Sequence, residues 1–402
     1  MSLDLTERLD ALRARRLYRS PPLVTGPQGA HLTVAGRPVI GLCSNDYLGL
    51  ASDPALRAAA HRAIDLYGVG AGASRLVSGT MEAHEAAEHA LAAFVEAPSA
   101  RLFATGYAAN VGTVQALVGP DDLIFSDALN HASLIDGCRL SRARVFVYRH
   151  ADVAHLEALL RAHRGEGRRA LILSDAVFSM DGDLAPVARL RALADAHDAA
   201  LMVDEAHALG VIGPGGRGVC ASAGVTPDAL VGTLGKAFGC AGAFVTGSSE
   251  LTDLLLQRAR SFVFSTAPSP ILAAVAVAAA ERVRAADGLR AKVAGLQARL
   301  RAELSGLGYE VRPGTTPIVP VLIGDAEETM RLSAALLERG VFAQGIRPPT
   351  VAPGTSRLRL VATAAHSDED IDQVVRAFAA VKAAGPLASP ASNAPTVTKD
   401  PR

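Results

Sequence analysis

Three residues that follow two apolar runs could act together in one reaction. The run ALMVD ends at Asp204, and His207 follows three residues later. A second run, ALVGTLG, leads to Lys236, 32 positions after Asp204 and set among small and apolar residues. Burial of a lysine lowers its pKa and frees the amine lone pair for attack. Taken alone, the aspartate could cap the next element and the histidine could pack locally, but the lysine beside them favours a chemical site.

This combination suits the cofactor pyridoxal phosphate (PLP). In PLP enzymes a lysine forms a Schiff base with the cofactor, and a carboxylate keeps the pyridine nitrogen protonated so that the ring withdraws electrons. The histidine could hydrogen-bond the phenolic oxygen of the ring. TGYAAN (105–110) offers backbone amides at the start of a predicted helix, where the helix dipole favours a phosphate. Ser179 in VFSMDGD and Thr233 in GTLGK add hydroxyl groups, although such residues usually only cap turns.

Other cofactor and metal motifs are not supported. The loop 213–218 fits GxGxxG, but a proline interrupts it and no acidic residue lies about 20 positions further on, which argues against a dinucleotide site. The sequence GKA at 235–237 lacks the remaining residues of a nucleotide P-loop. The 11 histidines contain no HExxH pattern. No CxxC pair occurs, so we expect neither a metal site nor disulfides but reduced, mostly buried thiols at Cys43, Cys138, Cys220 and Cys240.

Two kinds of segment alternate between residues 52 and 285 and would position these groups. Short aliphatic runs are each followed by turn or helix signals: RLFAT, DLIFSD, RVFVYR, ALILSD, ALMVDE, ALVGTLG and AFVTG. Such alternation predicts βαβ units and an α/β fold with a mostly parallel sheet between helices. Because ligands bind at the carboxyl ends of the strands in such sheets, we expect the function there.

The segments before and after this region have different sequence patterns. Residues 4–19 carry leucines at near-helical spacing, which predicts an N-terminal helical arm. From residue 288 on, a long helix and shorter apolar units predict a smaller α+β domain, followed by a Pro/Ala/Ser-rich tail. We therefore expect an N-terminal helical arm and segment at 1–45, a large domain at 46–287, a small C-terminal domain at 288–384 and a disordered tail at 385–402.

Composition argues against several classes of partner. The chain has 402 residues, of which 50% are hydrophobic and 20% charged, as in ordinary globular proteins. The 40 basic residues balance 40 acidic ones, so the composition does not indicate the positive electrostatic potential that nucleic-acid-binding proteins use. The longest apolar stretch, 271–280, is too short to span a membrane. The charged first residues do not resemble a secretory signal, and we expect a cytoplasmic protein.

Eight motifs are spread over residues 10 to 383: SNDYLGLA (44–51), GAGASRLVSG (70–79), TGYAAN (105–110), NHASLIDG (130–137), VFSMDGDLAP (177–186), VDEAHALGVIGPGGRG (203–218), GTLGKAFG (232–239) and RLRLVATAAH (357–366). Their sequences and order resemble the α-oxoamine synthases, which are PLP enzymes. The resemblance implies fold type I of the PLP-dependent transferases, like aspartate aminotransferase, and a homodimer with shared active sites. Two departures, Ala87 and the small residues of GCAGA (239–243), remove no chemical group.

The resemblance also implies roles for individual residues. Lys236 would be the Schiff-base lysine, Asp204 the partner of the pyridine nitrogen and His207 the partner of the phenolic oxygen. His131 of NHAS would stack on the ring and contact the substrate. The other cofactor positions would be Gly106 and Tyr107 at the phosphate, the hydroxyls of Ser179 and Thr233, and Ser265 and Thr266, which would reach the partner subunit's site. The other substrate positions would be Asn45, Arg359 at the amino-acid carboxylate, Arg347, and Arg19 and Thr350 at the acyl substrate.

The family condenses an amino acid with an acyl thioester and releases carbon dioxide. The stretch 346–366, with its IRPPT, and the RRLYR of the arm most resemble the member that uses L-alanine and a pimeloyl thioester, carried by coenzyme A or an acyl-carrier protein. The main alternative is a glycine acyltransferase of the same family that uses acetyl-, succinyl- or long-chain acyl-CoA. A non-catalytic partner subunit is a third reading, which the presence of Lys236 disfavours.

Overall fold

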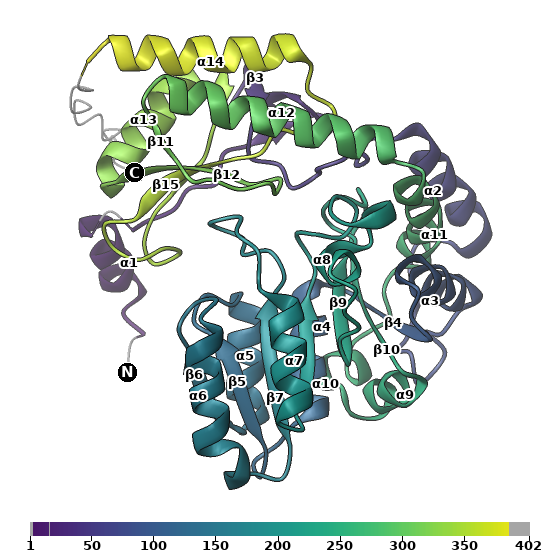
Figure 1. Ribbon diagram of the computed structural model, residues 1–402. Helices are drawn as coiled ribbons and strands as arrows, with labels where there is room; N and C mark the ends of the chain where they lie inside the picture. Colours follow the sequence, from purple (N-terminus) through teal and green to yellow (C-terminus); the bar gives the residue numbers. More distant parts are fainter. Residues whose placement is uncertain (1–2, 16, 386–402) are drawn as a thin grey trace.

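A seven-stranded sheet lies at the centre of the large domain (Figure 1). The computed structural model describes residues 3–15 and 17–385, so all but the first residue of the tail expected at 385–402 lies outside the described residues. In spatial order the strands are β4 (Ser99–Phe103), β10 (Ala243–Gly247), β9 (Ala229–Thr233), β8 (Ala200–Asp204), β7 (Ala170–Asp175), β5 (Leu123–Asp127) and β6 (Arg144–Tyr148). Within this sheet β10 runs antiparallel to both neighbours, and the other pairs are parallel. The mostly parallel sheet predicted from the alternating runs is therefore confirmed.

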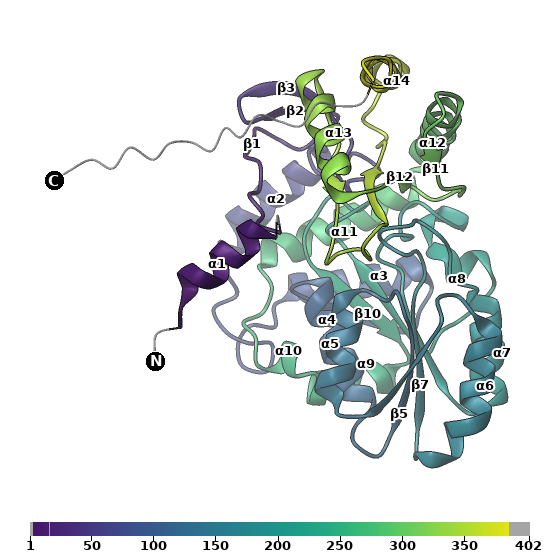
Figure 2. The same ribbon diagram turned by 90° about the vertical axis from the view of Figure 1, so that its left-hand side faces the viewer.

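Helices cover both faces of this sheet, as Figure 2 shows on either side of β5 and β7. One face carries α6 (Val153–His163), α7 (Val187–Ala196) and α8 (Gly218–Ser222), and the other carries α4 (Gly106–Leu117), α5 (Ala132–Ser141), α9 (Ser249–Arg258) and α10 (Arg260–Val263). Consecutive strand residues point to opposite faces. In β7, Ile172 packs with Leu156 of α6, whereas Leu173 packs with Val114 of α4. Burial on both faces explains why the run ALILSD shows no polar alternation.

A third group of helices packs beside β4. It consists of α2 (Pro54–Tyr67), α3 (Glu82–Val95) and α11 (Pro270–Arg284), and α11 contacts both of the others. Local sequence fixes two of the helix starts. Asp53 accepts a hydrogen bond from the Ala55 amide at 2.7 Å and Ser269 accepts one from the Ile271 amide at 3.3 Å, each just before a proline that begins the helix.

The C-terminal part forms a smaller α+β unit above the large domain in Figure 1. Its sheet has the order β11 (Glu310–Val311), β12 (Val319–Gly324), β15 (Ser356–Leu360) and β14 (Gly345–Ile346), and its helices are α12 (Asp287–Gly306), α13 (Ala326–Glu338) and α14 (Asp368–Ala383). One core contains Leu300, Val321, Leu336 and Phe378 from these helices and strands. β15 itself carries Arg359, which links this unit to the site.

The N-terminal segment contains strands that the sequence analysis did not expect. An antiparallel ribbon of β1 (Val24–Thr25), β2 (His31–Val34) and β3 (Arg37–Gly41) pairs in parallel with β13 (Val341–Phe342). Residues 24–41 therefore share a sheet with the C-terminal unit. The predicted arm contains α1 (Leu5–Ala14), which buries no residue against this chain. The proposed domain boundaries stay a prediction.

Candidate active site

The carboxyl ends of three parallel strands bring the chemical residues together. Asp175 ends β7 and is paired in register with Asp204, the last residue of β8, while Lys236 lies just beyond β9. The Asp204 carboxylate accepts hydrogen bonds from the Ala206 amide at 2.8 Å and from the Asn110 side chain at 2.7 Å. These two donors hold a buried carboxylate at the carboxyl end of β8, as the sequence analysis predicted.

Lys236 has the environment of a reactive amine. Burial lowers the pKa of Lys236 to about 8, although the nearby charges of Asp204 and Asp175 oppose the shift. The other described lysines donate to backbone carbonyls, Lys292 to Ala364 and Lys382 to Leu307. Lys236 is thus the described lysine suited to act as a nucleophile or base near neutral pH.

The lowered pKa of Lys236 predicts how the PLP-free protein reacts with an amine-directed reagent. The labelling rate at Lys236 should rise about tenfold per pH unit up to about pH 8 and then level off, because the uncharged amine is the reactive form. Peptide mass spectrometry after labelling between pH 6 and 10 measures this rate. The labelling rate of a lysine derivative with a blocked α-amine, measured in the same sample, should keep rising up to about pH 10. The prediction would be contradicted if the rate at Lys236 rose with pH in the same way.

Two histidines face the same region. His207 is buried, and its Nδ1 lies 2.6 Å from the Tyr47 hydroxyl. Burial and then the charges of Lys236 and Arg359 hold the pKa of His207 well below its usual value, so the ring is neutral. His131 caps the start of α5, and its backbone amide donates to Asp175 at 2.7 Å.

Arg359 of β15 reaches the site from the small domain. Its Nε donates to the Ser179 carbonyl at 2.5 Å, whereas its Nη2 is buried and has no hydrogen-bond partner among the described residues. A buried guanidinium nitrogen without a partner is costly. A substrate carboxylate would satisfy it, as the resemblance implies.

The remaining predicted residues fall into three places. The first turn of α4 carries Gly106 and Tyr107 on the helix that also supplies Asn110 to Asp204. The Thr233 hydroxyl donates to Gly242 at 3.3 Å beside the Lys236 loop, and Asn45 lies 3.4 Å from the Tyr47 hydroxyl. The other residues lie apart from the strand ends, in two groups described next.

One of these groups joins the arm to the loop before β15. Arg19 donates to the Thr350 hydroxyl at 3.0 Å, and Arg347 donates to the Tyr18 carbonyl at 2.9 Å. Neither arginine has a carboxylate partner among the described residues. The contact between the arm and this loop therefore contains two guanidinium groups whose charge no described carboxylate balances.

The second group, Ser265 and Thr266, lies on a segment that pairs with the loop 70–79. Thr266 forms a bridge with Ser74, and the amide of Ala267 donates to the Ala73 carbonyl at 2.9 Å. Within the described part of this chain, no hydrogen bond joins Ser265 or Thr266 to Lys236 or Asp204. A role of these two residues in this chain's own site is therefore not visible.

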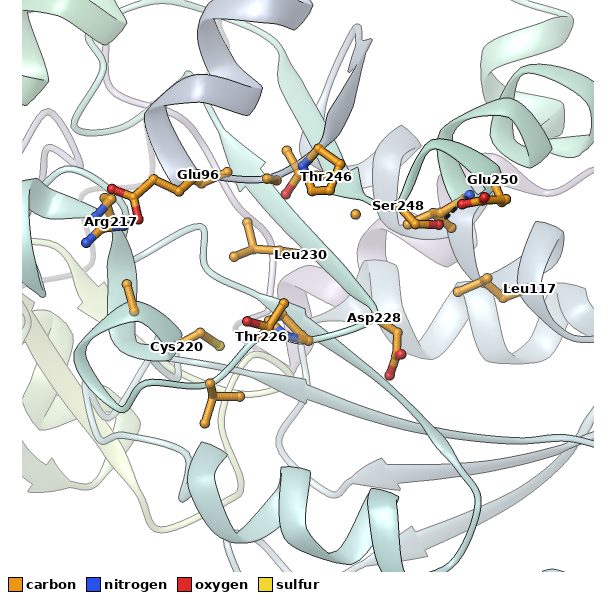
Figure 3. A pocket seen from close by; sticks show the side chains of 18 of the residues that line it. Glu96, Leu117, Arg217, Cys220, Thr226, Asp228, Leu230, Thr246, Ser248 and Glu250 are labelled. Carbon is orange, nitrogen blue, oxygen red and sulfur yellow. Dashed lines mark hydrogen bonds and ion pairs between the residues drawn. The ribbon is translucent and has the colours of Figure 1, made fainter.

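Two hollows show which end of the sheet suits a ligand. A cavity of about 850 Å³ lies between the 178–183 turn and the loop 348–357, and its lining includes Ser179 and Thr350. A second hollow of about 790 Å³ opens at the start of β9, near Asp228 (Figure 3). The described residues that line this second hollow include no lysine or histidine. Lys236 and Asp204 line neither hollow, but the first one includes Ser179, which follows β7 at the end of the sheet where Asp175 lies. Among the described residues, no cluster of three or more His, Cys, Asp or Glu side chains could hold a metal ion, and no helix has the length and apolar character of a membrane span.

Sequence reasoning missed three residues that the structure places in the site: Tyr47, Asn110 and Asp175. Asp175 ends the run ALILSD as Asp204 ends ALMVD, so the rule that singled out Asp204 could have found it. Tyr47 and Asn110 lie inside SNDYLGLA and TGYAAN. Nothing in their spacing shows that they meet His207 and Asp204, because those contacts span 160 and 94 positions.

Comparison with known proteins supports one family. The family model described as aminotransferase class I and II matches residues 37–378. The chain is 52% identical to an 8-amino-7-oxononanoate synthase of Pelobacter propionicus, over 92% of this chain and 96% of that protein. It is 49% identical to one of Geobacter sulfurreducens, over 95% and 98%.

Solved structures agree with this result. A serine palmitoyltransferase of Sphingomonas wittichii matches with a TM-score of 0.90 at 33% identity, covering 95% of this chain and 98% of that one. A solved SPT with PLP matches at 0.91 and 31%, covering 95% and 99%. An 8-amino-7-oxononanoate synthase of Francisella tularensis matches at 0.74 and 27%, covering 86% and 98%. The expected fold type and the PLP cofactor are confirmed. The chain belongs to the class I and II aminotransferase family of PLP-dependent enzymes.

Proposed function

We propose that this chain condenses L-alanine with a pimeloyl thioester to give 8-amino-7-oxononanoate, carbon dioxide and a free thiol, a step of biotin biosynthesis. One observation carries the proposal: Lys236, with its pKa lowered by burial, lies at the strand ends that also hold Asp204, and Arg359 faces them. The names of the Pelobacter and Geobacter relatives support the choice of substrates. The cytoplasmic location expected from the sequence stays a prediction.

The residues at these strand ends fit PLP. A half-buried amine with a lowered pKa beside a buried carboxylate matches the aldehyde and the pyridine nitrogen of the cofactor. The amides of Gly106 and Tyr107, in the first turn of α4, have no acceptor in the described structure and suit a phosphate. We assign the remaining cofactor contacts to His131, His207, and the hydroxyls of Ser179 and Thr233.

Three side chains of this chain then have separate roles in the reaction. Bound PLP supplies an electron-withdrawing ring, which stabilises negative charge at the substrate Cα. Lys236 Nζ takes the proton from that Cα and returns one after carbon dioxide leaves, because its pKa of about 8 suits both directions near neutral pH. Asp204 holds the proton on the pyridine nitrogen, and Arg359 holds the carboxylate of the amino acid.

Arg359→Lys should raise the KM for the amino acid by about 30-fold, with a smaller change in kcat, because a lysine cannot replace the two-pronged guanidinium contact. Steady-state kinetics over a range of amino-acid concentrations measures this. The exposed Arg57 of α2 provides the control, and Arg57→Lys should leave KM within twofold. An unchanged KM in the Arg359 variant would place the carboxylate elsewhere.

The acyl chain would occupy the cavity between the 178–183 turn and the loop 348–357. Its lining includes Leu129, Phe178 and Val351, which suit methylene groups, and Thr350 connects it to Arg19. A pimeloyl chain ends in a second carboxylate. Arg19, which donates to Thr350 at the rim of this cavity, and Arg347, which precedes its lining residue Pro348, are the cations to which we assign it.

Arg19→Ala should therefore affect a diacid substrate more than its monoacid counterpart. We expect the KM for pimeloyl-CoA to rise about tenfold, whereas any turnover of heptanoyl-CoA, which lacks the distal carboxylate, should be unaffected. Thiol release with the two thioesters measures the difference. Equal changes in KM for the two thioesters would show that Arg19 does not bind the distal carboxylate.

The proposal includes a homodimer. Val69, Val77 and Phe264 are 73%, 78% and 73% exposed, on segments that bond to each other next to Ser265 and Thr266. Exposed apolar side chains that gather in this way mark interaction surfaces. A second copy seated there would bring Ser265 and Thr266 to its phosphate site, as the resemblance implies.

Free-thiol release by the PLP-loaded protein tests the function. L-Alanine and glycine are crossed with pimeloyl-CoA, acetyl-CoA and a pimeloyl-acyl-carrier protein, and the product is identified by mass spectrometry. Release with alanine and a pimeloyl donor supports the proposal and shows which carrier serves. Release with glycine and acetyl-CoA, or no release with any pair, would overturn it.

A further inference from the structure

Tyr47 contacts the site but has no role in the reaction described above. Its side chain is fully buried, and its hydroxyl lies 2.6 Å from Nδ1 of His207. The turn that carries it is held by Asp46, whose two carboxylate oxygens accept from the amides of Leu50 at 2.8 Å and Ala51 at 3.0 Å. The Tyr47 carbonyl accepts from the Ala364 amide at 2.9 Å. The hydroxyl is therefore presented to His207 by a fixed backbone.

The phenol has one proton and two acceptors within reach. His207 Nδ1 lies at 2.6 Å, whereas Asn45 Oδ1 lies at 3.4 Å, which is long for a hydrogen bond between two oxygens. Burial raises the pKa of Tyr47, although the charge of Arg359 opposes the shift, so the phenol keeps its proton. The nearer acceptor is the better one for that proton, so we assign the short contact as a donation from the tyrosine to the histidine.

A neutral imidazole carries one proton, on whichever nitrogen is not accepting. Since the ring of His207 is neutral and its Nδ1 accepts from Tyr47, its proton lies on Nε2. This nitrogen has no hydrogen-bond partner among the described residues. It is thus a free N–H donor at the site.

We propose that Tyr47 is a positioning residue that fixes His207 in the tautomer with its proton on Nε2. Without the phenol, Nδ1 would lose its donor and the proton could move to it, leaving Nε2 as an acceptor. A donor at Nε2 suits an anionic oxygen such as the phenolic oxygen of PLP, and an acceptor would repel it. This last consequence rests on the proposed function, whereas the tautomer does not.

Nitrogen NMR of the PLP-loaded enzyme labelled with ¹⁵N-histidine tests the proposal, since the shifts of the two ring nitrogens report the tautomer. The signals of His207 are assigned by their loss in His207→Gln. We expect an unprotonated Nδ1 and a protonated Nε2 in the unaltered chain. In Tyr47→Phe the preference for Nε2–H should be lost and kcat should fall about tenfold. Tyr309→Phe, which removes a hydroxyl bonded to the Phe378 carbonyl in the small domain, should change neither.

A proton on Nδ1 of His207 in the unaltered enzyme would overturn the proposal, and this measurement does not depend on whether the variant folds. An unchanged tautomer in a folded Tyr47→Phe would also overturn it. Because the NMR readout needs no substrate, it stays separate from the thiol-release assay. Failure of the predicted condensation with the expected tautomer would count against the function and leave the role of Tyr47 intact.

Discussion

Lys236→Ala is expected to lower kcat by about 10⁴-fold or more and to abolish covalent attachment of PLP. The substitution removes both the amine that holds the cofactor and the base that moves the Cα proton. The structure offers no replacement, since the other described lysines donate to backbone carbonyls of Ala364 and Leu307. Two functions are lost with one side chain, and this makes the expected effect the largest.

Borohydride reduction followed by intact-mass measurement detects the attachment, because reduction makes the link to the lysine permanent. The unaltered protein should retain the mass of PLP and the variant should not. An added small primary amine should restore part of the turnover of Lys236→Ala. Lys382→Ala, which removes an exposed lysine far from the strand ends, should behave as the unaltered chain does. Full turnover by Lys236→Ala without added amine would remove Lys236 from the mechanism.

The fold of the large domain was predictable because each strand has a strong local signal. ALILSD and ALMVD are largely apolar on both faces, as expected for a sheet covered by helices on both sides, and the structure shows that arrangement. The strands of residues 24–41 were missed. They are short, and β3 pairs with β13 some 300 positions away, as in Ile40 with Val341. A pairing of that kind depends on tertiary structure and leaves little trace in local sequence.

The candidate site was predictable where chemistry and strand ends coincide. Asp204 and Lys236 follow apolar runs, so their type and position were both visible. Tyr47 was not, because it reaches His207 from a turn in a different part of the chain. Ser265 and Thr266 are a different case. The resemblance implies that they reach the site of a partner subunit, and that contact forms only between two chains.

Asp204→Asn is expected to lower kcat by about 10²–10³-fold and to weaken PLP binding. The asparagine keeps the shape of the side chain and can still meet Asn110, but it carries no charge to hold a proton on the pyridine nitrogen. The substitution therefore tests charge more than packing. Single-turnover kinetics at saturating PLP separates the loss in rate from the loss in cofactor affinity. Asp228→Asn makes the same chemical change at the opposite end of the sheet, before β9, and should leave kcat within twofold.

The neighbouring carboxylate decides how the result is interpreted. Asp175 is paired with Asp204 across β7 and β8, and burial together with the charge of Asp204 raises the pKa of Asp175 well above its usual value. Two buried carboxylates side by side cannot easily both be charged. The raised pKa makes Asp175 the poorer candidate for the charged partner of the pyridine nitrogen. Asp175→Asn should therefore cost much less in kcat than Asp204→Asn. The reverse order would exchange the two roles and assign the pyridine nitrogen to Asp175.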